Sequence, residues 1–244
     1  FSKGISPFVR DMLPRMKSKY IAGLDGDDYW TDKSKLQKQY DILESNENCM
    51  IVHHNSFKVF VNDQKKELYH KKVIGTLGFD DILKQNKIIS SSVVFRNINL
   101  DNFIKAASTT HFVDRLLWTY LLKHGHAFYM NENFSNYLIH DKGINSAEKY
   151  HDRLKKRLYA REKLLDIEFN KRQSELIIKS ILRLRFLIII ISLIKLQRKE
   201  FFFQVRELFI FKNKVKSNVM LLITELSLVL FIDLPSIVLN RIKK

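Results

Sequence analysis

Apolar and polar residues along the first part of the chain alternate between strand-like and helix-like patterns. Residues 20–24, YIAGL, form a short apolar run that stops at a group of acids, which predicts a buried strand. In residues 32–46 the apolar side chains recur at the spacing of one helix face, and Asp32 is placed to cap the start of that helix. The pattern therefore predicts a strand, an acidic turn and a helix in succession.

The same two periodicities predict the elements that follow. Residues 49–61 are expected to form a strand or one arm of a hairpin, with NDQKKE as the turn after it. Beyond them we expect a short helix at 78–86, a strand at 88–97, an amphipathic helix at 113–125 closed by Gly125, and short extended segments at 126–132 and 134–143. These elements together predict an α/β module.

From residue 146 to Pro235 the pattern is helical almost without interruption. Two apolar stretches stand out, at 186–194 and at 219–232, and the second contains Glu225. A helix that spans a membrane needs about 20 mostly apolar residues, so neither stretch is a good candidate. We expect helices that are buried, or that lie in a membrane interface beside lysines and arginines.

Composition indicates the cellular compartment in which the chain folds. The chain has 244 residues, of which 45% are hydrophobic, enough to build a core. Cys49 is the only cysteine, which excludes an intramolecular disulfide and favours a reducing, cytoplasmic setting. The first residues lack the apolar core of a secretory leader, and the chain opens without Met in what reads as a loop and helix. We therefore expect an N-terminal part to be missing.

Charge divides the chain into two parts. The net charge is +16; residues 1–150 hold 21 Lys and Arg against 17 Asp and Glu, whereas residues 151–244 hold 21 against 9. All seven glycines lie at or before residue 143. The predicted domains are therefore an α/β module at 1–146 and a basic, all-helical C-terminal extension at 147–244.

The acidic turn is the strongest candidate for chemistry. Asp25, Asp27 and Asp28 crowd three carboxylates into four positions at the end of a predicted strand. Oxygen ligands favour hard divalent cations, and Mg²⁺ is usually held by one or two carboxylates together with phosphate oxygens and water. The turn therefore predicts a metal-bound diphosphate, against the simpler alternative of a solvated loop or helix cap. A calcium loop is disfavoured because its twelfth position would be Leu36.

Three segments in order resemble family 2 glycosyltransferases. KSKYIAGLDGDDYWTDKSKLQKQYDILESN resembles the region of the family's DXD motif, and SSSVVFRN at 90–97 resembles its strand beside the acceptor site. Residues 113–146 resemble the family's catalytic-Asp helix, glycine turn and terminal Tyr-x-x-His segment. The resemblance covers residues 1–146 and implies a partial GT-A fold, a Rossmann-like nucleotide-diphospho-sugar transferase module.

The resemblance implies roles for individual residues. Asp25 and Asp27 match the DXD pair, with Asp27 as the direct ligand of Mn²⁺ or Mg²⁺ and Asp25 nearer the ribose or a metal-bound water. Asp28 either joins them at the nucleotide or caps the following turn. His140 matches the family's histidine that assists the metal or the diphosphate, although Leu138 stands where the family has an arginine.

Asp114 matches the family's general base, which implies an inverting mechanism. Such a base takes the proton of the acceptor hydroxyl while that oxygen attacks the anomeric carbon. The simpler alternative is an acid at the start of a helix, favoured by the helix dipole. The implied reaction moves a sugar from a nucleoside-diphosphate sugar to a saccharide or lipid-linked acceptor in cell-surface polysaccharide synthesis.

One departure from the family lies upstream of the acidic turn. Family members carry a strand, a helix and further strands there, including the acid that binds the nucleotide's base, and this chain has only a short segment. We therefore expect the chain to be weakly active or inactive unless it is extended.

The remaining histidines and tryptophans are expected to be structural. We expect polar or packing roles for His53, His54, His111, His124 and His126. Trp30 and Trp118 are expected to be core residues or to form a pocket wall.

Two other classes of function compete with the transferase. Phosphatases with an aspartate nucleophile also place Asp-x-Asp after a strand, but Tyr29 replaces the usual small residue and no matching lysine and acidic pair is evident. The non-catalytic alternative is a basic module that binds a membrane surface or nucleic acid, although no nucleic-acid motif appears. For the extension, packing on the module competes with a contact on the anionic cytoplasmic face of a membrane.

Overall fold

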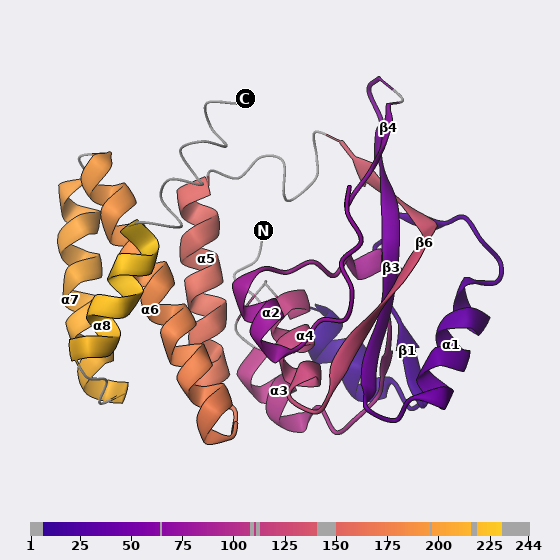
Figure 1. Cartoon of the computed structure of the whole chain (residues 1–244), viewed down its shortest axis with the longest axis horizontal. Helices are drawn as coiled ribbons and strands as arrows, with labels where there is room; N and C mark the ends of the chain where they lie inside the picture. The colour runs from indigo at the N-terminus through magenta and orange to yellow at the C-terminus, as the bar shows by residue number, and fades with distance from the viewer. Residues whose placement is uncertain are drawn as a thin grey trace. The chain divides into compact units, whose positions relative to one another are not determined.

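The chain forms two compact units, Phe1–Glu148 and Lys149–Lys244. The computed structural model describes residues 7–63, 65–107, 110, 113–140, 150–195, 197–215 and 219–230 (Figure 1). The first, or N-terminal, unit is mixed α/β, and the described residues of the second, C-terminal unit are helical. The predicted α/β class and the helical C-terminal region are therefore confirmed.

A curled sheet is the frame of the N-terminal unit. Its strands lie in the order β1, β5, β3, β6, β2, with β4 paired to the outer part of β3. Among the strand pairs of the described residues, β3 and β6 run parallel to each other and the others are antiparallel. The strands are β1 Tyr20–Ala22, β2 Tyr29–Trp30, β3 Cys49–Phe60, β4 Lys66–Leu68, β5 Val94–Arg96 and β6 His126–Ile139.

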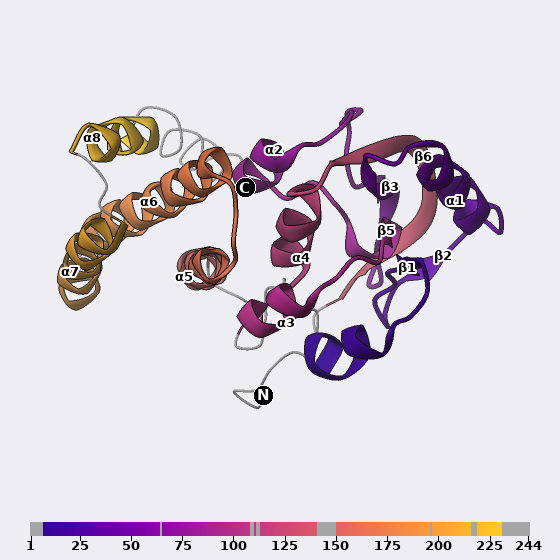
Figure 2. The same ribbon diagram turned by 90° about the horizontal axis from the view of Figure 1, so that it is seen from below.

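Helices cover both faces of this sheet. Helix α1 (Lys35–Ser45) lies on one face, and α2 (Phe79–Lys84), α3 (Asp101–Ala107) and α4 (Val113–Leu122) lie on the other (Figures 1 and 2). Coverage on both sides explains why the first eight residues of β3 are all buried, since a strand between two helical layers has no solvated face. Trp118 of α4 belongs to this core, with its ring edge-on to Phe95 at 5.7 Å.

Local hydrogen bonds shorten or lengthen several predicted elements. The strand expected at 88–97 is only Val94–Arg96, because Ser92 turns the preceding residues into a short 3₁₀ helix by donating its N–H and hydroxyl to the Ile89 carbonyl. The two extended segments expected after residue 125 form one continuous strand, β6. Local hydrogen bonds thus set the start of β5, whereas the length of β6 follows from its pairing with the distant strand β3, which periodicity does not reveal.

Two predicted helix ends are wrong in detail. Helix α1 has Ser34 at its N-cap, and Asp32 instead accepts a hydrogen bond from the Ser34 N–H at 2.7 Å. Helix α4 ends at Leu122, and Gly125 does not adopt a positive φ. A Cβ at Gly125 would lie 2.1 Å from the Asn48 carbonyl oxygen, so glycine is required there for close backbone approach.

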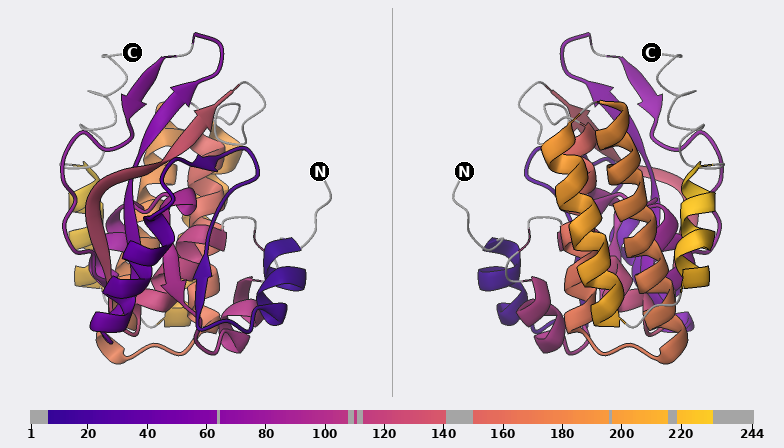
Figure 3. Two further views of the ribbon diagram at one scale, coloured as in Figure 1. Left: turned by 90° about the vertical axis from the view of Figure 1, so that its right-hand side faces the viewer. Right: turned by 90° about the vertical axis from the view of Figure 1, so that its left-hand side faces the viewer.

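The C-terminal unit is built around one long helix. Helix α6 (Lys171–Ile194) contacts α5 (Tyr150–Glu162), α7 (Arg198–Val215) and α8 (Val219–Leu228), and α6 and α7 lie side by side in the right-hand view of Figure 3. Asn170 starts α6 by accepting a hydrogen bond from the Gln173 N–H at 2.9 Å. The apolar stretch at 186–194 forms the last nine residues of α6; Phe186, Leu187, Ile188 and Ile191 are buried, whereas Leu193 and Ile194 are 56% and 63% exposed. Among the described helices, none has the length and apolar character needed to cross a membrane.

Candidate functional site

The acidic turn leaves the sheet between β1 and β2. Gly23 begins it, and its N–H donates to the Val93 carbonyl at 3.1 Å. A Cβ at Gly23 would lie 2.8 Å from the Ser90 carbonyl oxygen, so glycine lets the turn run directly against the segment before β5. The Asp28 N–H donates to the Asp25 carbonyl at 3.1 Å and closes the turn.

Asp28 fastens the turn to strand β6. Its side chain is 8% exposed, and its Oδ1 accepts a hydrogen bond from the Leu138 N–H at 3.0 Å. Burial raises the pKa of this carboxyl, and the Leu138 hydrogen bond acts in the opposite direction. The second oxygen, Oδ2, is buried, and the Ser91 side chain lies close enough to lower the pKa of Asp28 as a hydrogen-bond donor would. Asp28 is thus a structural anchor of the turn.

Asp27 is joined to His140, the residue after β6. The His140 Nε2 lies 3.0 Å from Asp27 Oδ2, and the Asp27 side chain is 51% exposed. The two residues were both predicted to serve the metal or the diphosphate, and the fold brings them into contact. Because Leu138 holds Asp28, the end of β6 contacts two successive carboxylates of the turn.

Asp25 lies in a field of like charges. Its carboxyl reaches the surface, yet the protein packed around it removes enough water to raise the pKa of Asp25 to about 6. The negative charges of Asp28, Asp27 and Asp114 raise that pKa further. The four acids predicted from the sequence therefore lie in one electrostatic neighbourhood.

Asp114 interacts with Asp25 from a different element, helix α4. It lies in the first turn of α4, where the helix dipole favours the ionised carboxylate. Its Oδ2 accepts a hydrogen bond from Asn86 Nδ2 at 3.3 Å. Asn86 also caps its own loop, since its Oδ1 accepts from the Ile88 N–H at 3.1 Å. Asn86 can therefore orient the Asp114 carboxylate.

Two tyrosines lie in the same region: Tyr137, which belongs to the Tyr-x-x-His segment noted in the sequence, and Tyr69, which the sequence did not single out. The pKa of Tyr69 is raised first by burial and then by Tyr137, Asp114 and Asp28, which places its hydroxyl near those acids. The rings of Tyr69 and Tyr137 meet edge to face at 5.5 Å. Tyr69 follows β4, whose short alternating pattern carries too little signal to mark it in the sequence.

Trp30 and Lys35 pack against each other in the segment that follows the acidic turn. The Trp30 Nε1 donates to the Ser91 carbonyl at 2.9 Å, and Lys35 Nζ lies 4.1 Å from the centroid of the Trp30 ring. Lys35 is fully buried, its Nζ has no hydrogen-bond partner among the described residues, and burial lowers the pKa of Lys35 to about 8. Trp30 is therefore a wall residue of the site with a cation against it.

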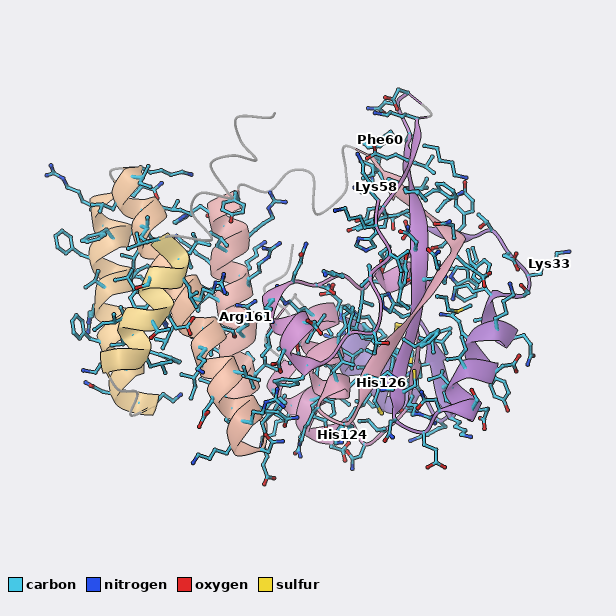
Figure 4. The ribbon with its side chains drawn as sticks, viewed as in Figure 1. Lys33, Lys58, Phe60, His124, His126 and Arg161 are labelled. Atoms are coloured by element: carbon cyan, nitrogen blue, oxygen red, sulfur yellow. The ribbon has the colours of Figure 1, made fainter. Side chains whose placement is uncertain are left out.

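The other histidines lie away from the acids or inside the sheet. His53 and His54 are fully buried in β3, and burial lowers the pKa of His53 to about 3 and that of His54 to about 4, so both are neutral at pH 7. His124 and His126 lie at the opposite end of the parallel β3 and β6 pair from Phe60 and Lys58 (Figure 4). His111 is outside the described residues.

The donor set does not form a closed metal cage. Among the residues that the structure describes, no three His, Cys, Asp or Glu side chains converge on one point. The predicted ligands Asp25, Asp27 and His140 are thus not assembled as a set, and the observed pair is Asp27 with His140.

Comparison with known proteins gives relatives without a described activity. No model of a known protein family matches the chain. The chain is similar to uncharacterized proteins of Mycobacterium bovis and of two strains of Mycobacterium tuberculosis, with 32% identity over 95 residues. The matched stretch covers 38% of this chain and 27% of each relative, so the chain corresponds to about a quarter of those proteins' length.

Proposed function

We propose that the chain carries the catalytic part of an inverting glycosyltransferase of the family 2 type. It would move a sugar from a nucleoside-diphosphate sugar to a saccharide or lipid-linked acceptor, as in cell-surface polysaccharide synthesis. The observation that supports this proposal is that the charges of Asp27, Asp28 and Asp114 all raise the pKa of Asp25, although Asp114 belongs to a different element, helix α4.

A partial GT-A fold belongs to the same proposal. In its support, the sheet is covered by helices on both faces, and a strand that enters the sheet at one end of its order leads directly into the acidic turn. Open α/β sheets bind ligands where loops leave the ends of their strands, and the acidic turn is such a loop.

A Mn²⁺ or Mg²⁺ ion would be held by Asp27 and Asp25 together with the donor's diphosphate. When bound, the ion supplies positive charge where the leaving nucleoside diphosphate becomes more negative. The chain's own contribution is to fix the acids: Asp28 ties the turn to Leu138, and His140 contacts the outer face of Asp27. In this position the His140 imidazole can donate to Asp27 or to a diphosphate oxygen.

Asp114 is the proposed general base. Its carboxylate accepts the proton of the acceptor hydroxyl as that oxygen attacks the anomeric carbon, and Asn86 holds it in place through the 3.3 Å hydrogen bond. Tyr69 and Tyr137 provide the aromatic surface that a sugar ring stacks against. Stabilisation of the leaving nucleoside diphosphate and acceptance of the acceptor's proton are thus divided between the turn and α4.

Binding of a nucleoside diphosphate tests the proposal without knowledge of the sugar. Calorimetry with uridine and guanosine diphosphates should show binding that requires Mn²⁺ and that is lost in Asp27→Asn. Asp41→Asn is the matched control, because Asp41 lies in α1 and pairs with Gln37 instead of the turn. Equal binding with and without Mn²⁺, or no binding of either nucleotide, would overturn the proposed donor site.

A further inference from the structure

One face of α7 combines large apolar side chains with positive charge. Phe202, Phe203, Phe209 and Ile210 are 67%, 54%, 61% and 49% exposed. The opposite side of the helix is packed, with Phe211 and Gln204 each 5% exposed. The exposed residues of α7 are Arg198, Lys199, Phe202, Phe203, Arg206, Phe209, Ile210, Asn213 and Lys214, and we call them the α7 face.

These nine residues form one continuous stripe. With 3.6 residues per turn they fall within about 160° of the helix circumference. The stripe contains four cations and no acid. The acids of α7, Glu200 and Glu207, lie outside it and are partly buried, and Glu200 forms an ion pair with Lys155 at 2.8 Å. The α7 face therefore consists of four apolar side chains, four cations and Asn213.

A small hollow adjoins the α7 face. It has a volume of about 150 Å³ and is lined by Phe186, Leu208, Phe209, Lys212, Leu222, Ile223 and Leu226. Phe209 belongs to both the hollow and the α7 face, and Ile223 is 53% exposed, so the hollow reaches the surface. Six of its seven lining residues are apolar, and the seventh, Lys212, is a cation.

We propose that the α7 face docks on an anionic lipid surface. Helices with aromatic and aliphatic side chains beside lysines and arginines lie in the plane of the interface, where apolar groups enter the boundary of headgroups and acyl chains while cations meet lipid phosphates. Phe202, Phe203, Phe209 and Ile210 are the inserted side chains, and Arg198, Lys199, Arg206 and Lys214 are the headgroup contacts. The hollow accommodates the end of one acyl chain.

Charge and apolar surface together favour lipid over the other occupants. A second copy of a chain with a net charge of +16 would bring cations against cations at this face. Nucleic acid would pair with the cations, but it would leave four exposed apolar side chains without a partner. A bilayer with anionic headgroups satisfies both kinds of residue.

Sedimentation with lipid vesicles tests the proposal. The chain should co-sediment with vesicles of phosphatidylglycerol and phosphatidylcholine, and less with phosphatidylcholine alone at the same salt concentration. Phe202→Ser combined with Phe203→Ser should lower the partition coefficient at least tenfold, and Arg206→Gln with Lys214→Gln should remove the preference for phosphatidylglycerol. Val61→Ser with Val73→Ser is the matched control, because these valines are 50% and 65% exposed in the N-terminal unit.

A second variant protects the test against a failure of folding. Phe203→Trp keeps an aromatic side chain, and its fluorescence should shift to the blue and be quenched by brominated phosphatidylglycerol, relative to the wild-type signal of Trp30 and Trp118. No co-sedimentation of the wild type, or no quenching of Phe203→Trp, would overturn the proposal. A dimer or a duplex-DNA complex that the phenylalanine variant abolishes would equally overturn it, in favour of those partners.

The docking proposal stands apart from the catalytic one. Nucleoside diphosphate binding with Mn²⁺, measured on the same phenylalanine variant, should equal that of the wild type. Lost lipid binding with normal nucleotide binding therefore concerns the α7 face alone, and the reverse result concerns the acidic turn alone.

Discussion

The His140 Nε2 lies 3.0 Å from Asp27 Oδ2, across 113 positions of sequence. Two residues earlier, the Leu138 N–H binds the neighbouring carboxylate of Asp28. The turn between β1 and β2 is therefore held by the end of β6, which is the last of the described strands along the sequence. The position of the candidate metal ligands is a product of strand pairing as much as of the turn's own sequence.

Protonation of Asp25 should make cation binding depend on pH. With the pKa of Asp25 raised to about 6, the carboxylate is largely ionised at pH 7.5 and becomes protonated as the pH falls below 6. Mn²⁺ affinity with nucleoside diphosphate should therefore fall across this range in the wild type, and more weakly in Asp25→Asn. Parallel titrations by calorimetry from pH 7.5 to 5 would contradict this if the two proteins showed the same profile.

The same pKa shift predicts a gain in stability on removing the Asp25 charge. A carboxyl whose pKa is raised by folding destabilises the folded state above that pKa, and the cost disappears as the pH falls through 6 toward the ordinary value of 3.8. Metal-free Asp25→Asn should have a higher melting temperature than the wild type at pH 7.5, with the difference shrinking toward pH 4. A lower melting temperature at pH 7.5 would show that Asp25 has a stabilising partner instead.

Asp28 should be sensitive to shape more than to charge. Asp28→Ala removes the acceptor of the partly buried Leu138 N–H and should cost about 1 to 3 kcal/mol in the free energy of unfolding. Asp28→Asn keeps an oxygen at that place and should cost less. Urea denaturation of the pair measures the difference, and equal losses would mean that the negative charge itself is required.

Asp114 should be required for turnover and dispensable for folding. Asp114→Asn should lower sugar transfer by about 10²- to 10⁴-fold, the range of general-base catalysis, while nucleoside diphosphate binding is kept. Asp101→Asn is its control, because Asp101 is likewise an acid in the first turn of a helix, α3. If both variants lost only stability and neither lost turnover, Asp114 would be a helix-dipole residue alone.

The buried Lys35 should leave a signature at alkaline pH. Burial lowers the pKa of Lys35 to about 8, so the ammonium destabilises the folded state below that pH, and stability should rise as the pH increases from 8 toward 10.5. Lys35→Met keeps the aliphatic volume and should lack this rise, whereas the exposed Lys33→Met should retain it. Thermal melts of the three proteins at pH 7 and 9.5 make the comparison.

Replacing glycine by alanine should lower stability at Gly125 but not at Gly26. Gly125→Ala would place a Cβ 2.1 Å from the Asn48 carbonyl, and we expect it to cost about 1 to 3 kcal/mol because the backbone must move apart. Gly26→Ala, in the acidic turn, meets nothing within 4 Å and should be tolerated. Denaturant unfolding of both variants is the measurement, and similar costs would remove the close-approach argument for Gly125.

The sequence predicted the elements of this protein better than their connections. Helices such as α2 and α4 have strong periodicity, and their existence was predicted correctly. The length of β6 depends on its pairing with β3, which is not encoded in any local window, and β5 is short because hydrogen bonds of Ser92 to the Ile89 carbonyl form a 3₁₀ helix before it. Gly125 was assigned to a helix end because the approach of Asn48 comes from a residue far away in sequence.

The residues of the candidate site were likewise predicted only in part from the sequence. Asp25, Asp27, Asp28, Asp114 and His140 were identified by residue type and by resemblance to a known family. Tyr69, Asn86 and Lys35 were not, because tyrosine, asparagine and lysine are common at the surface. Tyr69 and Asn86 are distinguished by their contact with the acids, and Lys35 by its burial against Trp30. Local pattern thus finds reactive groups, and the residues that position them become visible only in three dimensions.

The parallel pairing of β3 with β6 has a consequence for folding of the chain during translation. Parallel neighbours need a long crossover connection, which here runs from the end of β3 to His126. The acidic turn is translated early, but its two fastenings, Leu138 and His140, emerge more than a hundred residues later. A nascent chain halted before β6 would lack the contacts that hold Asp27 and Asp28, so the acidic turn would take its final position only after translation passes residue 140.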